Sequence, residues 1–424
     1  MRAYSPIGCF FPAQSGEPVP ANLAHHKHNS KLATLAHHVY ERAVIAHYTL
    51  GSLTLLGISL LLWQWIAARR FPLHQRIGTA PQPMPAVTLL KPLKGADAFT
   101  ENCLRSWFTQ EYSGPVQILF GVASASDPVC EVVRALMKQF PQQDAELIVV
   151  EELIGPNAKV SKLVELEKRA KHGIIVVSDA DVRVPSDFLQ NAVAPLANES
   201  VGLVNCFYRL QNPQTLAMRW EAVAINADFW SQVLQSKSLK PLDFALGAVM
   251  LTRRSELDAI GGFRTLADCL ADDYQLGNRI ARNNRSIVLC PVVVECWDPP
   301  MSWAAVWKHQ LRWARTIRVS QPVPYFFSVL SNSLIWPLLW AMVSPSKWSL
   351  AALVLCATIR IFAAADLQWQ LTRSTNHLFF AWMAPLKDLL QFGIWLCAFL
   401  GNTIEWRGRR FKLRPDGTLS PNPT

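Results

Sequence analysis

Residues 174–184 read IIVVSDADVRV, a run of β-branched residues followed by two aspartates one residue apart. The apolar run predicts a buried strand, so Asp179 and Asp181 follow its carboxyl end. Two carboxylates on an extended loop suit Mg²⁺ or Mn²⁺, which also takes phosphate oxygens as ligands. The alternative interpretation is a turn whose aspartates hydrogen-bond to the backbone.

Aspartyl-phosphate enzymes also place two aspartates after a strand, and the first aspartate is their nucleophile. Their signature continues with a small residue and then Thr or Val. Here Val182 and Arg183 follow instead, and Arg183 does not fit. The sequence therefore favours the metal and nucleotide interpretation over a phosphatase.

Similar β-branched runs lie upstream, and helical patterns separate them. The runs are VTLLKPL (87–93), VQILFGVA (116–123) and ELIVVEEL (146–153), and the helical patterns cover 127–140 and 159–171. Strands that alternate with helices predict an α/β fold with a mostly parallel sheet, over residues 72–322. Ligands in such folds bind beyond the carboxyl ends of the strands.

An apolar segment precedes this domain. Tyr48–Ala68 carries no charge and is long enough to cross a bilayer, so we assign a transmembrane helix to 45–70. The arginines that follow it predict that the α/β domain faces the cytoplasm. Residues 1–44 are of mixed polarity and rich in histidine, and we expect a poorly ordered extension rather than a signal peptide.

A second apolar region, 323–403, follows the domain. Its candidate spans are Tyr325–Met342, Leu350–Ala365 and Leu378–Leu400. The basic tail at 404–424 should stay cytoplasmic, which requires an even number of crossings. We therefore expect two to three C-terminal transmembrane helices, with one of the three segments interfacial or re-entrant if only two of them cross.

The composition favours a membrane protein. Half of the 424 residues are hydrophobic and 17% are charged, against roughly 25% charged in soluble domains. The net charge of +10 could serve nucleic acid, but the apolar spans make anionic lipid the better partner. Nine cysteines form no CxxC pair, which argues against a zinc knuckle or a thioredoxin-type site.

Two further segments carry chemistry. In DCLADDYQLGNRIAR (268–282), Asp272 and Asp273 precede a helix and serve either as a general base or as charges stabilised at the helix N-terminus. In WKHQLRWARTIR (307–318), arginines recur every three residues beside tryptophans, as in an interfacial helix or a diphosphate clamp. Gly247, Gly261 and Gly262 lie between the two acidic motifs in the chain, either as turn residues or for close approach of the backbone to a ligand.

The chain resembles the ceramide glucosyltransferase family, glycosyltransferase family 21, over about residues 86–320 and the flanking apolar segments. Within the family, HQLRWARTIR (309–318) and the C-terminal segments PLKDLLQF (385–392) and EWRGRRFKL (405–413) look closest to the bacterial branch of hopanoid biosynthesis. Five motifs carry the resemblance in order: TLLKPLKGAD (88–97), NAKVSKL (157–163), SDADVRV (178–184), ADDY (271–274) and HQLRW (309–313).

The resemblance implies a GT-A fold, a UDP-sugar donor, a Mg²⁺ or Mn²⁺ cofactor and inversion at the anomeric carbon. It implies that Asp273 is the general base, that Arg312 and Trp313 steady the diphosphate and the acceptor, and that Asp179 and Asp181 hold the metal. The residues that it implies for donor binding are Lys91, Pro92, Asp97, Lys159, Asp179, Asp181 and His309. The chain departs from the family where His309 replaces Gln or Arg and where Ser124 replaces an acid that contacts uracil.

The resulting expectation is an inverting enzyme of a bacterial inner membrane, with its catalytic domain in the cytoplasm. Its reaction would transfer N-acetylglucosamine from UDP to bacteriohopanetetrol, a hopanoid lipid. A ceramide glucosyltransferase using UDP-glucose is the first alternative. A polysaccharide synthase module would need a polymer channel, and a non-catalytic lipid-binding scaffold would tolerate loss of Asp181 or Asp273.

Overall fold

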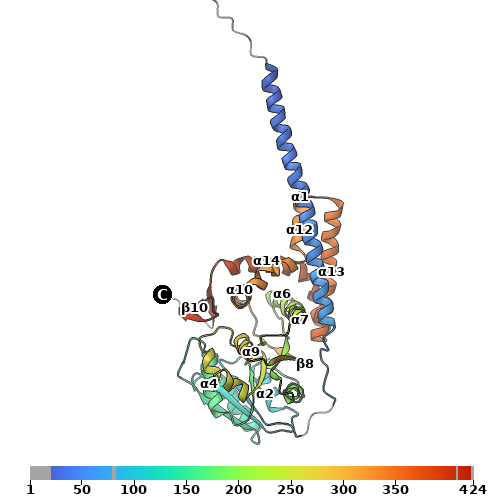
Figure 1. Ribbon diagram of the computed structural model, residues 1–424. Coiled ribbons are helices and arrows are strands. Elements are labelled where there is room, and N and C mark those ends of the chain that lie inside the picture. The colour runs from blue at the N-terminus through green and yellow to red at the C-terminus, as the bar shows by residue number, and fades with distance from the viewer. Residues whose placement is uncertain (1–20, 79–82, 407–408, 422–424) are drawn as a thin grey trace, which may run out of the picture.

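The computed structural model describes residues 21–78, 83–406 and 409–421, with side chains from residue 37 onward except residues 39 and 421. Figure 1 shows three levels: an α/β domain, a layer of helices lying above it, and upright helices that rise from that layer. The three levels are continuous, because one hydrophobic cluster runs from the sheet into the upright helices.

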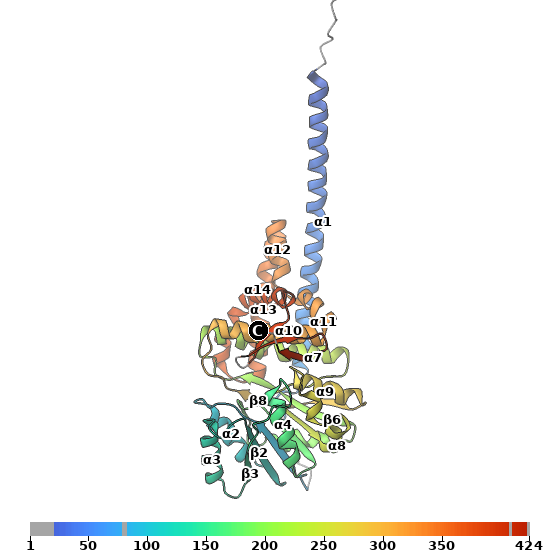
Figure 2. The same ribbon diagram turned by 90° about the vertical axis from the view of Figure 1, so that its left-hand side faces the viewer.

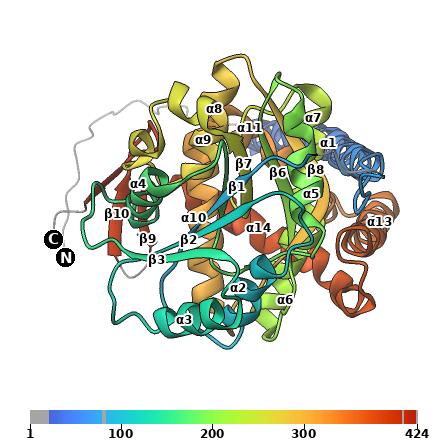
Figure 3. The ribbon, with the colours of Figure 1, turned by 90° about the horizontal axis from the view of Figure 1, so that it is seen from below.

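The α/β domain is built on an eight-stranded sheet, counted over the described residues, in the order β3-β2-β1-β4-β7-β6-β8-β5 (Figure 3). Strands β3, β2, β1 and β4 are mutually parallel, whereas β7 runs antiparallel to β4 and β6. All the strands expected from the β-branched runs are present, and the predicted mostly parallel α/β fold is confirmed. The strands are β1 Val87–Pro92, β2 Val116–Val122, β3 Asp144–Val149, β4 Ile174–Ser178, β5 Val182–Arg183, β6 Val201–Leu210, β7 Val249–Arg253 and β8 Ser286–Cys296.

Helices cover both faces of the sheet, because its central strands are apolar on both sides. Adjacent Leu89 and Leu90 of β1 are both buried but belong to different hydrophobic clusters, as the alternation of side chains along a strand requires. The helices of this domain are α2 Thr100–Phe108, α3 Val129–Gln139, α4 Ala158–Arg169, α5 Phe188–Val193, α8 Arg254–Ala259 and α9 Asp272–Arg282, with the 3₁₀ turns η1 Ala194–Ala197 and η3 Phe263–Leu266.

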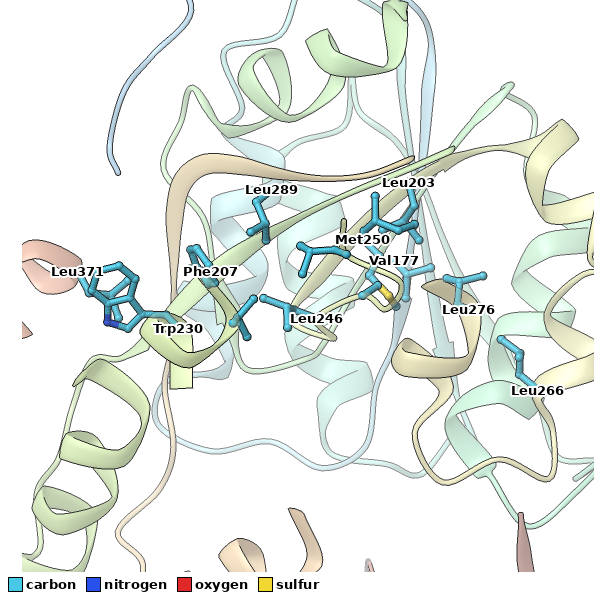
Figure 4. Close-up of a cluster of buried hydrophobic side chains, with 14 of the residues drawn as sticks. Val177, Leu203, Phe207, Trp230, Leu246, Met250, Leu266, Leu276, Leu289 and Leu371 are labelled. Carbon is cyan, nitrogen blue, oxygen red and sulfur yellow. The ribbon is translucent and has the colours of Figure 1, made fainter. Parts of the chain in front are cut away.

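One of these clusters joins the sheet to the membrane-directed helices. Figure 4 shows Val177 and Met250 of the sheet in the same cluster as Trp230 and Leu371. Trp230 belongs to α7 (Trp230–Leu239) in the helix layer and Leu371 to the upright helix α13 (Lys347–Thr372). Because these side chains share a buried core, the α/β domain is fixed against the upright helices.

The upright helices are α1 (Ala21–Arg69), α12 (Ile335–Val343) and α13. Within the described residues, Tyr40–Arg69 and α13 are long and apolar enough to cross a membrane. The predicted span at 45–70 therefore lies inside a longer helix. Residues 21–44 of the expected N-terminal extension belong to the same helix, and residues 1–20 lie outside the described residues.

The C-terminal spans differ in part from the expectation. The segment at 325–342 is a bent pair, Pro322–Ser331 and α12, with 56° between its parts. The pair comprises α11 (Pro322–Phe327), η4 (Ser328–Ser331) and α12. Together with α13 it gives two C-terminal candidates, the lower of the predicted numbers.

The segment at 378–400 does not form a single span. It is divided between η5 (Thr375–Met383) and α14 (Ala384–Phe399), and α14 lies across the direction of the upright helices (Figure 1). Its charged residues, Lys387 and Asp388, are buried in an ion network with Asp228 and Arg360. Burial in protein rather than in lipid explains how charges are tolerated in this apolar segment.

The helix layer consists of α6 (Leu216–Val223), the π-helical turn η2 (Ala224–Phe229), α7, α10 (Trp303–Ser320) and α14. Beside α10, the predicted basic tail forms a three-stranded antiparallel sheet, counted over the described residues (Figure 1). Its strands are β9 Thr403–Trp406, β10 Arg409–Leu413 and β11 Leu419–Pro421.

Candidate active site

Four acidic residues lie close together where β4 ends and α9 begins, and we call them the acidic cluster: Asp179, Asp181, Asp272 and Asp273. Lys159, at the start of α4, joins them: its Nζ lies 2.8 Å from Asp179 Oδ1 and 3.0 Å from Asp272 Oδ2. Burial by itself lowers the pKa of Lys159, but the two carboxylates outweigh burial and raise it above its usual range. The structure thus brings together the predicted residues Asp179, Lys159 and Asp273 with a neighbour, Asp272, to which the resemblance gave no role.

Asn157 explains why α4 begins at this point. Its side-chain oxygen accepts hydrogen bonds from the backbone amides of Lys159 (3.0 Å) and Val160 (3.2 Å), as in an N-cap. Its amide nitrogen donates to Cys269 O at 2.8 Å and reaches Asp272 Oδ1 at 3.3 Å. Asn157 was absent from the predicted site, although a helix-capping Asn two residues before a predicted lysine was a usable signal.

Asp273 is half-buried, and its position depends on a glycine. Its Oδ1 accepts a hydrogen bond from the backbone amide of Tyr274 at 2.8 Å. A Cβ on Gly247 would lie 2.6 Å from Asp273 Oδ2, so only glycine leaves room for this carboxylate. Burial, and then the charge of Asp272, raise the pKa of Asp273 to about 6. A base whose pKa lies near neutrality is suited to proton abstraction from a hydroxyl.

The Asp179–Asp181 pair has the donor set of a divalent-metal site. Burial, with the charges of Asp179 and Asp298, raises the pKa of Asp181 to about 7. No group of three or more His, Cys, Asp or Glu side chains in the described part of the chain is placed to hold a metal ion. Mg²⁺ commonly takes one or two carboxylates plus substrate phosphates, and this pair fits that requirement.

Lys91 supports the loop that follows β4 and carries Asp179 and Asp181. Its Nζ donates to Asp179 O at 2.6 Å and lies 5.4 Å from the centre of the Trp107 ring. The side chain is fully buried, which lowers the pKa of Lys91 to about 8. Pro92 ends β1 beside it. The interaction partners of Lys91 are therefore part of the protein, and direct contact with a donor stays a prediction.

Asp97 is engaged locally as well. Its Oδ1 accepts hydrogen bonds from the backbone amides of Phe99 (2.8 Å) and Thr100 (2.9 Å) and from the Thr100 hydroxyl (2.9 Å). These bonds fix the entry into α2. Contact between Asp97 and a nucleotide stays a prediction.

His309 and Trp313 lie together on one face of α10. His309 Nδ1 is 2.7 Å from Glu221 Oε1, and the two ring centroids of His309 and Trp313 are 4.8 Å apart. Trp313 packs in turn on Phe229. Glu221 is buried on α6 and was not among the residues predicted for the site. In the sequence it could have been noticed as a single acidic residue among apolar ones.

Arg312 is placed differently from Trp313. It lines a pocket between α10 and the strands β9 and β10, together with Lys308, Arg315 and Arg410. None of the four acidic residues described above lines this pocket. The contact of Arg312 with a diphosphate stays a prediction.

Known proteins share both the sequence and the fold. The profile described as "Glycosyl transferase family 21" matches residues 49–419. Ceramide glucosyltransferase 3 of Caenorhabditis elegans is 23% identical over 83% of this chain and 78% of its own length. The beta-monoglucosyldiacylglycerol synthase of Trichormus variabilis is 24% identical over 63% of this chain and 55% of its own.

A solved structure matches the fold. The mannosyltransferase of Pyrobaculum calidifontis, in complex with GDP-Man and Mn²⁺, superposes with a TM-score of 0.52 and 20% identity over 81% of this chain and 99% of its own. Since the family profile covers most of the sequence and includes every motif of the acidic cluster, the chain belongs to glycosyl transferase family 21 and is a hexosyltransferase built on the GT-A fold.

Proposed function

We propose that this enzyme transfers a sugar from a UDP-sugar to the hydroxyl group of a membrane lipid, at the cytoplasmic face of a bacterial inner membrane. The observation that carries the proposal is the acidic cluster bridged by Lys159 at the start of α9, a helix that lies directly below the helix layer (Figure 2). A lipid held at the bilayer surface and a sugar nucleotide from the water phase could both reach such a site. The candidate membrane helices support the same location.

The proposed chemistry assigns one task to each side chain. Asp273 accepts the proton of the lipid hydroxyl, and the resulting oxygen attacks the anomeric carbon in line with departing UDP, which inverts the configuration. Lys159 holds Asp179 and Asp272 in position through its two ion pairs. Asp179 and Asp181 would hold a divalent cation, which stabilises the negative charge that develops on the diphosphate.

The donor and acceptor that we propose are UDP-N-acetylglucosamine and bacteriohopanetetrol. This choice rests on the resemblance of the HQLRWARTIR and C-terminal segments to the hopanoid branch. The names of the relatives support the main alternatives, which are glucose transfer to ceramide or to diacylglycerol. All of these reactions share the catalytic roles given above.

The test is a transfer assay with purified protein in detergent. UDP-N-acetylglucosamine and UDP-glucose are each offered with bacteriohopanetetrol, ceramide and diacylglycerol, and products are identified by mass. Asp273→Asn should abolish product, a chelator should do so reversibly, and Asp258→Asn, at an exposed aspartate of α8, should leave it unchanged. A glucosylated ceramide or diacylglycerol would overturn the substrate assignment, and transfer by Asp273→Asn at the wild-type rate would overturn the base.

A further inference from the structure

A basic pocket lies between α10 and the C-terminal sheet, outside the acidic cluster. Four cationic side chains line it, and the single carboxylate among its lining residues, Glu405, is already 2.9 Å from Lys308 Nζ. Its volume of about 200 Å³ is below the roughly 300–1,000 Å³ of typical small-molecule sites, so it suits a group smaller than a sugar nucleotide. The four cations are Lys308, Arg312, Arg315 and Arg410.

The guanidinium group of Arg315 forms only part of its possible hydrogen bonds within the described part of the chain. One of its terminal nitrogens donates to Thr403 O on β9, but its Nε is buried without a hydrogen-bond partner in the described part of the chain. Burial, and the neighbouring Arg318, lower the pKa of Arg315. An anion with several oxygens could accept hydrogen bonds from neighbouring guanidinium groups and neutralise their charge.

The helices on the same level as the pocket carry many exposed apolar side chains. The C-terminal sheet lies beside α10 in Figure 1, level with the lower parts of α1 and α13. Basic side chains next to exposed tryptophan and other apolar residues are typical of elements that lie on anionic bilayers. The exposed apolar side chains of α10, α11 and α14 are Trp303, Trp307, Ile317, Val323, Phe326, Phe327, Leu386, Leu390, Leu396 and Phe399.

The C-terminal sheet is also connected to the active site. Its residues 417–419 pair with the loop before α9: Leu419 N donates to Asp268 O at 2.7 Å, and Leu270 N donates to Gly417 O at 3.2 Å. The same loop supplies Cys269 O, the acceptor for Asn157, which in turn contacts Asp272. A ligand that fixes the sheet would therefore fix the loop that positions the catalytic acids.

We infer that this pocket binds the phosphate of an anionic membrane lipid, such as phosphatidylglycerol, and that the bound headgroup orders the C-terminal sheet together with the loop at 268–272. The phosphate matches the cationic lining of the pocket and the unpartnered Nε of Arg315, and the lipid origin matches the exposed apolar side chains of α10, α11 and α14. Lipid binding of this kind needs neither the donor nor the acceptor, and it would replace the predicted contact of Arg312 with the diphosphate.

Hydrogen exchange of the full-length protein in nanodiscs tests the inference without any substrate. Discs of phosphatidylcholine alone are compared with discs containing increasing phosphatidylglycerol, and the amides of β9–β11 and of 268–272 are followed. Phosphatidylglycerol should slow their exchange in the wild type. Each basic residue near an anionic surface changes affinity about fivefold, so Lys308→Gln/Arg410→Gln should need roughly twenty-five times more of the lipid.

The matched control is Arg134→Gln/Lys138→Gln, which removes two exposed charges from α3, at the far side of the domain from the helix layer (Figure 2). It should respond to phosphatidylglycerol as the wild type does. Equal exchange in both kinds of disc, or an unchanged response of the pocket variant, would overturn the inference. Equal protection by soluble glycerol phosphate in phosphatidylcholine discs would overturn the assignment to a lipid.

Discussion

Gly247→Ala should slow sugar transfer about a hundredfold while leaving the protein folded. The new Cβ would lie 2.6 Å from Asp273 Oδ2 and 3.2 Å from Asp273 Cγ. Ordinary contacts begin near 3.4 Å, so the carboxylate must retreat by about 0.8 Å, the difference between 3.4 and 2.6 Å. A misplacement of about 1 Å in a reacting group costs on the order of 100-fold in rate.

The backbone itself should accept this substitution. Gly247 is not among the described glycines that have a positive φ, so alanine introduces no left-handed strain. The expected signature is a fall in kcat with little change in the KM of the donor, because the base is displaced while the donor-side residues stay in place. The thermal unfolding midpoint in detergent should stay close to that of the wild type.

Steady-state kinetics with the lipid acceptor identified in the transfer assay measure this effect. Gly173→Ala is the control, since a Cβ at Gly173 meets nothing within 4 Å, and it should behave as the wild type. Wild-type kcat in Gly247→Ala would refute the placement of Asp273 as the base. An equal loss in Gly173→Ala would show that the effect is not specific to the carboxylate.

Three further predictions follow from buried charges. Burial and Asp272 raise the pKa of Asp273 to about 6, so kcat/KM should fall about tenfold per pH unit below that value as the base becomes protonated. A flat pH profile of kcat/KM down to pH 5 would contradict this role. Lys159→Met leaves Asp272 buried without its cation, so we expect a loss of about 3–5 kcal/mol, visible as a lower unfolding midpoint, and an unchanged midpoint would disprove the bridge. Arg360→Met should lower the stability of the helix layer in the same way, whereas Arg360→Met/Asp388→Leu should recover part of the lost stability. Strictly additive effects of the two single changes on stability would argue against the coupling of these residues.

Much of the candidate site was predictable because its residues stand at the ends of regular elements. The β-branched run before Asp179 predicted β4, and the end of a strand is where ligands bind in α/β folds. The acids at 272–273 open α9, as a charge pattern at a helix start suggests. What these patterns could not give was the distance between the segments.

The apolar segments also show which features the sequence could not predict. Hydropathy correctly located apolar segments in 48–68 and 350–365, but it could not tell that 378–400 lies across the layer as α14. That outcome depends on Asp228 and Arg360, which come from other helices and neutralise Lys387 and Asp388. Hydropathy averages one segment and contains no information about partners elsewhere in the chain.

The amino-acid sequence by itself determined the alternation of strands and helices, the acidic motif after β4 and the apolar length of α1, because these depend on residues within a few positions of one another. Tertiary structure alone decided that Lys159 bridges Asp179 and Asp272 and that Gly247 leaves room for Asp273. These partners are 20 to 113 residues apart in the sequence. At such separations no periodicity links two residues, and only the packing of the folded chain brings their atoms within 3 Å.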